Sequence, residues 1–67
     1  METVKKTSTE ATITLTAEEL RILNNAINES LEALGSNEDE FQTRMGISTD
    51  KATKMLKAIN TLIKQMT

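Results

Sequence analysis

The chain has no cysteine and no histidine among its 67 residues, and it also lacks tryptophan and tyrosine. Without cysteine it can form no disulfide, and without either residue it lacks the usual ligands of a structural zinc site. The same absences remove the commonest general base and the commonest thiol nucleophile. We therefore expect no catalytic residue, no metal site and no cofactor, and we expect that the protein is not an enzyme.

Glycine is also scarce, and Gly35 and Gly46 are too far apart to form a phosphate-binding loop. The only acidic cluster, residues 38–40, lacks the glycine and the ligand spacing of a calcium-binding loop. No apolar run approaches the ~20 residues needed to cross a bilayer, and residues 1–10 contain no apolar segment typical of a secretion signal. These features predict a cytoplasmic protein without membrane association.

The short length limits the stability that one domain can gain from its core. Below ~70–80 residues a single core usually contributes only ~3–5 kcal/mol, and small domains often add disulfides or metal ions. This composition excludes both, so oligomerisation is the remaining common route, and we predict a homodimer. We place one small helical domain at residues 11–67 and expect residues 1–10, rich in Thr, Lys and Glu, to be a flexible N-terminal segment.

The charges divide the chain into two oppositely charged parts. Residues 1–40 contain nine carboxylates and three cations, a net charge of −6, whereas residues 41–67 contain one carboxylate and five cations, a net charge of +4. We favour the interpretation that these charges complement each other within a monomer or a dimer. The alternative is a basic C-terminal surface for an anionic partner.

The hydrophobic pattern predicts a mainly α-helical fold in which one short N-terminal β-strand precedes a long helix, a short helix and a second long helix. Residues 11–16 alternate apolar and polar side chains with a period of two, which is typical of a half-buried strand. A lone strand has two unpaired edges. We therefore expect it either to pair with its copy in a dimer or to pack along the helices.

The first long helix is expected to begin with a capping box formed by Thr16 and Glu19, and Gly35 is expected to end it in the left-handed conformation. Its apolar residues form a main stripe and a second, partly apolar face, which indicates contacts on two sides. The main stripe comprises Leu20, Leu23, Ile27, Leu31 and Leu34, and the second face comprises Ile22, Ala26 and Ala33.

The short helix is expected to run from about Glu38 to Met45, with Asn37 as its N-cap and Gly46 at its end. Ser48 is the expected N-cap of the last helix. The apolar stripe of that helix comprises Ala52, Met55, Ile59, Leu62 and Met66, with Leu56 and Ile63 beside it.

Residues 40–64 resemble a helix-turn-helix domain. The matching positions are Phe41 and Met45 in the first helix, Gly46, Ile47 and Ser48 in the turn, and Ala52, Met55 and Leu56 in the second helix. The resemblance implies a trihelical, DNA-binding fold with recognition positions at Thr49, Asp50, Lys51, Thr53, Lys54 and Lys57. Lysines there would contact phosphates, and threonines would reach base edges. The chain departs from the family at Gln42, where a small residue is usual, and by carrying no arginine on this face.

Three other polar residues are candidates for contact with a partner or a ligand. Asn24 and Asn28 border the apolar stripe of the first helix, and Arg44 precedes Gly46. For each, we favour a structural role, which for Arg44 is a salt bridge to the carboxylates of the first helix. The chain also resembles small bacterial proteins of unknown function, a resemblance that implies no activity.

The favoured function is therefore a dimeric protein–protein interaction or adaptor module. The alternative is a helix-turn-helix transcriptional regulator that binds DNA. A more remote alternative is a dimer that binds a small ligand at its interface.

Overall fold

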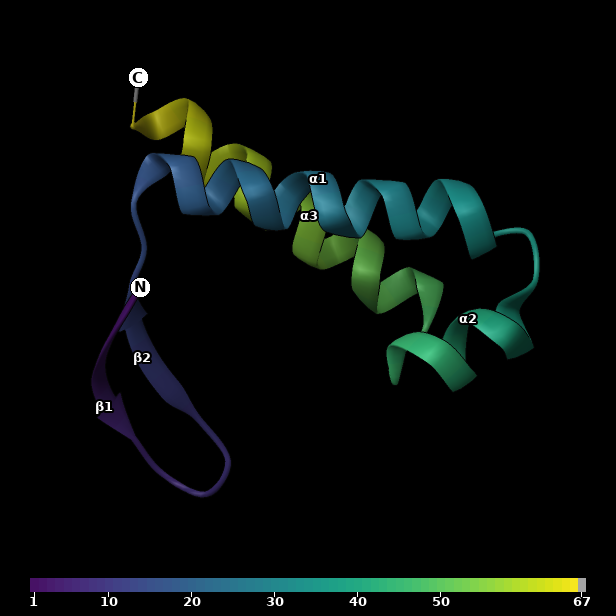
Figure 1. Cartoon of the computed structure of the whole chain (residues 1–67), viewed down its shortest axis with the longest axis horizontal. Coiled ribbons are helices and arrows are strands. Elements are labelled where there is room, and N and C mark those ends of the chain that lie inside the picture. Colours follow the sequence, from purple (N-terminus) through teal and green to yellow (C-terminus); the bar gives the residue numbers. More distant parts are fainter. Residues whose placement is uncertain (67) are drawn as a thin grey trace.

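The computed structural model of the protein describes residues 1–66 (Figure 1). A β-hairpin precedes three helices, and the elements are β1 (Glu2–Lys6), β2 (Ala11–Thr14), α1 (Ala17–Leu34), α2 (Glu38–Met45) and α3 (Thr49–Gln65). The expected mainly α-helical fold, with two long helices separated by a short one, is confirmed. Thr67, the last residue of the expected domain, lies outside the described residues.

The N-terminal β-element is a hairpin rather than the single strand that the sequence predicts. β1 and β2 pair in antiparallel register, from Glu2 opposite Thr14 to Lys6 opposite Ala11, with an irregularity at Val4. The expectation that β2 lacks a partner within its own chain was therefore wrong. The boundary expected between residues 10 and 11 lies at the start of β2. Residues 1–10 therefore contain β1 and the turn of the hairpin.

The hairpin stands apart from the helices (Figure 1). Every residue of both strands is exposed. Within residues 1–66, no Cα atom of either strand lies within 8 Å of a Cα atom in a helix. The N-terminal amine of Met1 nevertheless donates to Oε2 of Glu19 at 2.6 Å, which ties the start of the hairpin to α1. An isolated two-stranded hairpin is at best marginally stable in water. The helices of the same chain add little to the stability of this hairpin.

Local hydrogen bonds begin the helices where the sequence predicts. At α1 the Glu19 backbone N–H donates to Oγ1 of Thr16 at 3.1 Å, and the Thr16 N–H donates to Oε1 of Glu19 at 3.0 Å, so the capping box is confirmed. Asn37 caps α2, and Ser48 caps α3, each by accepting a backbone N–H with its side-chain oxygen. The three N-termini are thus fixed by residues close in sequence.

The two glycines end their helices in different ways. Gly46 has a φ of 72°, the left-handed conformation that was predicted, and its N–H donates to the carbonyl of Gln42. The same prediction for Gly35 was wrong, because its φ of −64° is that of a right-handed helix. A Cβ atom at position 35 would instead collide with the carbonyl oxygen of Leu31, so close approach is what favours glycine there.

The core is thin. Only three apolar residues are buried within the described chain, one from each helix: Leu20, Phe41 and Ala52. The radius of gyration is 13.2 Å, whereas a compact chain of this length has about 11 Å. The fold is therefore more open than that of a self-contained domain.

Candidate protein-interaction surface

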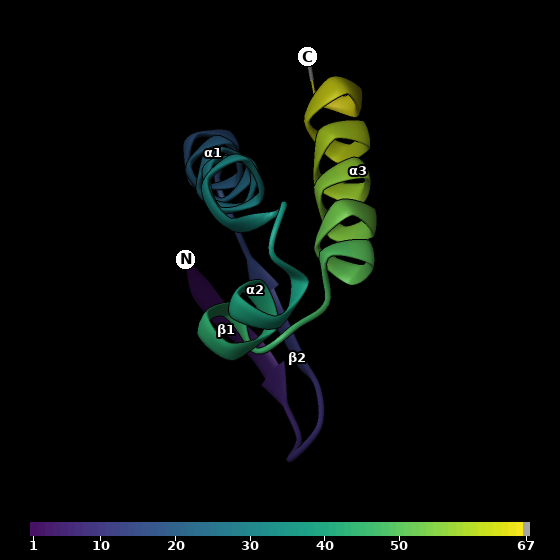
Figure 2. The same ribbon diagram turned by 90° about the vertical axis from the view of Figure 1, so that its right-hand side faces the viewer.

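α1 and α3 pack against each other while running in opposite directions, and α2 lies beside the end of α1 and the start of α3 (Figures 1 and 2). The buried and half-buried positions show which sides of the two helices meet. On α1 they include Leu20, Asn24, Ile27, Leu31 and Leu34, and on α3 they include Ala52, Leu56, Ile59 and Ile63.

Part of the predicted apolar stripe of α3 is exposed. Met55, Leu62 and Met66 were expected in the buried stripe, but each is exposed on 45–49% of its surface. Leu23 of α1, also expected in the buried stripe, is 37% exposed. The reason is that the apolar arc of each helix is wider than the strip that one neighbouring helix covers.

These uncovered residues lie on one side of the helix pair. With ~100° per residue, Leu23, Ala26 and Ile22 are rotated from Leu20 by about 60–160° in one sense. Met66, Met55 and Leu62 are rotated from Ala52 by about 40–80° in the same sense. Because α1 and α3 run in opposite directions, equal senses of rotation bring both sets to the same side. We call this surface the α1/α3 apolar face and define it as Ile22, Leu23, Ala26, Met55, Leu62 and Met66.

Methionine accounts for much of the exposed apolar surface. All four methionines are among the exposed large apolar residues, namely Met1, Val4, Ile13, Ile22, Leu23, Met45, Met55, Leu62 and Met66. Methionine is unbranched and polarisable, and it is frequent at surfaces that adapt to a partner. Two of the four, Met55 and Met66, belong to the α1/α3 apolar face, which is therefore suited to packing against another protein.

The accessible area of the chain is larger than that of a typical monomer of its mass. The chain exposes 5303 Å², whereas a folded monomer of 7.4 kDa exposes about 4,200 Å². The excess is about 1,100 Å², and each partner in a standard protein–protein interface buries about 800 Å². Part of this excess belongs to the projecting hairpin, whose strand residues are all exposed, and the rest belongs to the helices.

The two long helices carry opposite charges. α1 has four carboxylates and one arginine, a net charge of −3, and α3 has four lysines and one aspartate, a net charge of +3. At ~100° per residue, Glu29 is next to Ile22 at the edge of the apolar face on α1, and Lys51, one turn before Met55, is at its edge on α3. The apolar face is thus bordered by acidic side chains on one helix and basic side chains on the other.

The positions that the helix-turn-helix resemblance assigns to DNA recognition lie at the start of α3. Lys51, Lys54 and Lys57 are exposed, whereas Thr49 and Thr53 are half-buried. The Thr49 backbone N–H donates to Oε1 of Glu38 at 3.3 Å. Hydrogen bonds from Thr49 and then from Gln42 hold the pKa of Glu38 below its usual value. A carboxylate therefore occupies the positive end of α3, where it would repel a phosphate.

The other three candidate contact residues make separate interactions. The Oδ1 atom of Asn24 is buried without a hydrogen-bond partner in the described chain. Asn28 donates to Oε1 of Glu32 at 3.4 Å. Arg44 forms its ion pair with Glu40 of α2 at 3.1 Å, so the expected bridge to helix α1 was wrong: a carboxylate one turn away on the same helix was closer. These side chains do not join in one site.

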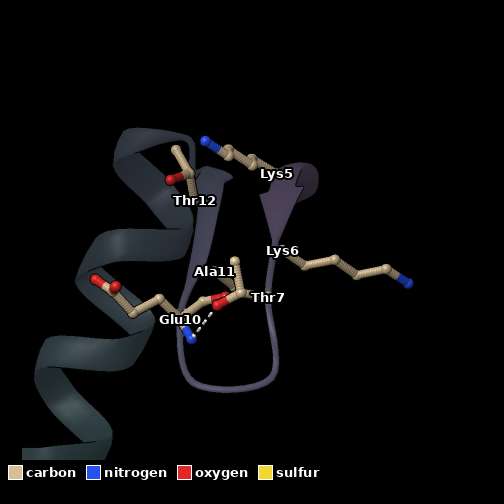
Figure 3. Close-up of a pocket in the computed structure, with 6 residues that line it drawn as sticks. All are labelled: Lys5, Lys6, Thr7, Glu10, Ala11 and Thr12. Carbon is tan, nitrogen blue, oxygen red and sulfur yellow. Dashed lines mark hydrogen bonds between the residues drawn. The ribbon is translucent and has the colours of Figure 1, made fainter.

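Two shallow hollows open on the surface, and neither gathers chemically functional groups. One lies at the hairpin and is lined by Lys5, Lys6, Thr7, Glu10, Ala11 and Thr12 (Figure 3). In Figure 3 the side chains of Lys5, Lys6 and Glu10 point in different directions rather than toward a common centre. The other adjoins the turn before α3 and is lined by Gln42, Gly46, Ile47, Ser48 and Lys51.

The described residues also contain no group of three or more acidic side chains placed to hold a metal ion. In residues 1–66, no helix has the length and apolar character needed to span a bilayer. The α1/α3 apolar face and the projecting hairpin are therefore the features from which a function can be argued. No protein-family model, no curated protein and no solved structure matches the chain.

Proposed function

We propose that the chain is a non-enzymatic protein-interaction module that acts as a homodimer. The observation that carries this proposal is the α1/α3 apolar face, which no part of residues 1–66 covers. Its large side chains are exposed on 37–59% of their surface. Covering such a face removes apolar area from water at about 25 cal/mol per Å², the main favourable term in association.

The first experiment is a mass measurement by sedimentation equilibrium over a wide range of protein concentrations. A homodimer has twice the chain mass of 7.4 kDa, and the dimer fraction should rise with concentration. A single species with the mass of one chain at all concentrations, with the helical circular dichroism intact, would contradict the proposal.

In the adaptor role, the dimer binds a further protein in the cytoplasm. The hairpin supports this role because, in residues 1–66, no Cα atom of its strands lies within 8 Å of a helix Cα atom, and because Val4 and Ile13 are exposed on it. Hydrogen exchange would show whether a partner uses it: the amides of residues 2–14 exchange quickly in the dimer alone and become protected when the partner binds. Protection confined to the helices would argue against the hairpin as the contact.

A second candidate function is DNA binding by α2 and α3. The observation in its favour is that Lys51, Lys54 and Lys57 are all exposed along the first half of α3, after a turn with a left-handed Gly46. It predicts salt-dependent retention on duplex DNA that is lost when Lys54 and Lys57 are replaced by glutamate. Lack of retention at low salt would exclude it. The charge of Glu38 beside Thr49 makes it the weaker candidate.

A further inference from the structure

We infer that the α1/α3 apolar face is the dimer interface and that α1 of one copy packs on α3 of the other. The inference rests on the proposed homodimer and specifies its geometry. The occupant of the face is then a second copy of the same chain, placed by a two-fold axis that runs along the helices. Both faces are buried at once, because an isologous interface uses the same surface on each partner.

The apolar residues of both helices fit this occupant. Five large apolar side chains of the face are exposed on 37–59% of their surface, and a second copy would cover them with the same residues. Both helices contribute large apolar side chains on the same side, so two copies placed face to face form a four-helix arrangement with a common core. A dimer thereby supplies the interior that Leu20, Phe41 and Ala52 alone do not provide.

The charges decide how the two copies are arranged. A net charge of −3 on α1 and +3 on α3 makes α1 against α1 repulsive and α1 against α3 attractive. A two-fold axis parallel to the helices brings each α1 over the partner's α3, whereas an axis across them would bring α1 over α1. The observed charges therefore favour the first arrangement.

The same axis predicts which charges meet at the border of the interface. The end of α1 lies near the start of α3 in each chain (Figure 1). A two-fold axis along the helices keeps this level in both copies. Glu29, near the end of α1 and at the edge of the apolar face, is thus brought close to Lys51, in the first turn of the partner's α3. The two-fold symmetry repeats this set of contacts on the other side.

A reciprocal charge reversal tests the pairing. The acidic-helix variant carries Glu29→Lys, and the basic-helix variant carries Lys51→Glu. Each variant alone places like charges opposite each other in both halves of the dimer, and we expect its dissociation constant to rise at least about tenfold. Mixing the two variants restores opposite charges in both halves, so the heterodimer should form about as tightly as the wild-type dimer.

The measurements are sedimentation of each variant alone and of the equimolar mixture, with circular dichroism to show that each is folded. Failure of the mixture to associate better than its components would overturn the inference. So would variants that each dimerise as tightly as wild type or more tightly, because charge reversal would relieve the repulsion in a dimer with α1 packed on α1. A wild-type chain that remains monomeric would instead refute the proposed homodimer itself, so the two failures are distinct.

A second pair of variants tests the apolar part of the interface without relying on charge pairs. Leu62→Asp places a carboxylate in the apolar face, and Asn60→Asp places the same charge on the same helix outside that face. We expect the first to raise the dissociation constant at least about a hundredfold and the second to change it less than about threefold. Equal effects would refute the assignment of this face.

Discussion

The backbone N–H of Thr49 donates to Oε1 of Glu38 at 3.3 Å, a contact between residues 11 positions apart that joins the start of α2 to the start of α3. Nε2 of Gln42 donates to the same oxygen at 2.9 Å. One carboxylate oxygen thus fixes the angle between the two helices and places a negative charge at the positive end of α3. Whichever partner approaches this part of α3 meets that charge.

This contact predicts a pH-dependent contribution to stability. The pKa of Glu38 is lowered from its ordinary value of 4.5. The contribution is therefore fully present above pH 4.5 and is lost as the pH falls through the lowered pKa of the folded state. Glu38→Gln should lower the melting temperature at pH 7, and the difference from wild type should disappear in acid. Asp39→Asn, in the same first turn of α2, is the control. If both variants behave alike, only the helix dipole is involved.

Replacing Asn24 by an apolar residue should stabilise the fold. The Oδ1 atom of Asn24 is buried without a hydrogen bond in the described chain, and an unsatisfied buried polar group costs about 1–3 kcal/mol. We expect Asn24→Leu to increase the free energy of unfolding by about 1–2 kcal/mol in urea denaturation. The matched control is Asn25→Leu, at an exposed position, where a change within about 0.5 kcal/mol is expected. A destabilised Asn24→Leu would show that the amide has a partner.

Replacing Gly46 should destabilise the fold through the backbone conformation rather than through packing. A Cβ atom at this position meets no heavy atom within 4 Å, yet its φ is 72°. We therefore expect Gly46→Ala to destabilise the fold by about 1–2 kcal/mol through the left-handed backbone alone. Gly46→Asn should cost less, since asparagine tolerates this conformation better. Equal losses for Ala and Asn, measured by thermal unfolding, would point to a steric cause instead.

Replacing Phe41 tests how much stability the core can lose before the chain unfolds. Among the described residues, Phe41 is the large side chain that is completely buried. Phe→Ala in a core costs about 3–5 kcal/mol, as much as a small core supplies in total. We expect Phe41→Ala to be largely unfolded at 25 °C by circular dichroism. Met45→Ala, an exposed apolar position one turn later, should remain folded.

Much of the helical part of the fold follows from the sequence because its determinants are local. The Thr16–Glu19 capping box, the Asn37 and Ser48 caps and the left-handed Gly46 each depend on residues within four positions of one another. Short-range hydrogen bonds of this kind are readable from residue type and spacing. They fixed the N-termini of all three helices and the C-terminus of α2.

The features that were missed depend on residues far apart. β1 has one large apolar residue, Val4, so it lacks the alternation that marks a strand, and its pairing with β2 is a tertiary choice. The period of α3 shows the width of its apolar arc but not the part that α1 covers, so the exposure of Met55 and Leu62 was not predictable. The sequence identified Ile22 and Ala26 as part of a second apolar face of α1, but the part of the face on α3 could be recognised only once α1 was in place.

The uncovered hairpin also affects how the protein should behave when it is concentrated. Both long edges of a two-stranded ribbon present unpaired amide and carbonyl groups, and such edges invite stacking of one ribbon on another into larger aggregates. Lys5 and Lys6 are consecutive on β1, so they place positive charges on opposite faces of the ribbon, and charged side chains discourage this stacking. The two lysines thus lower the tendency of the exposed hairpin to form fibres at high protein concentration.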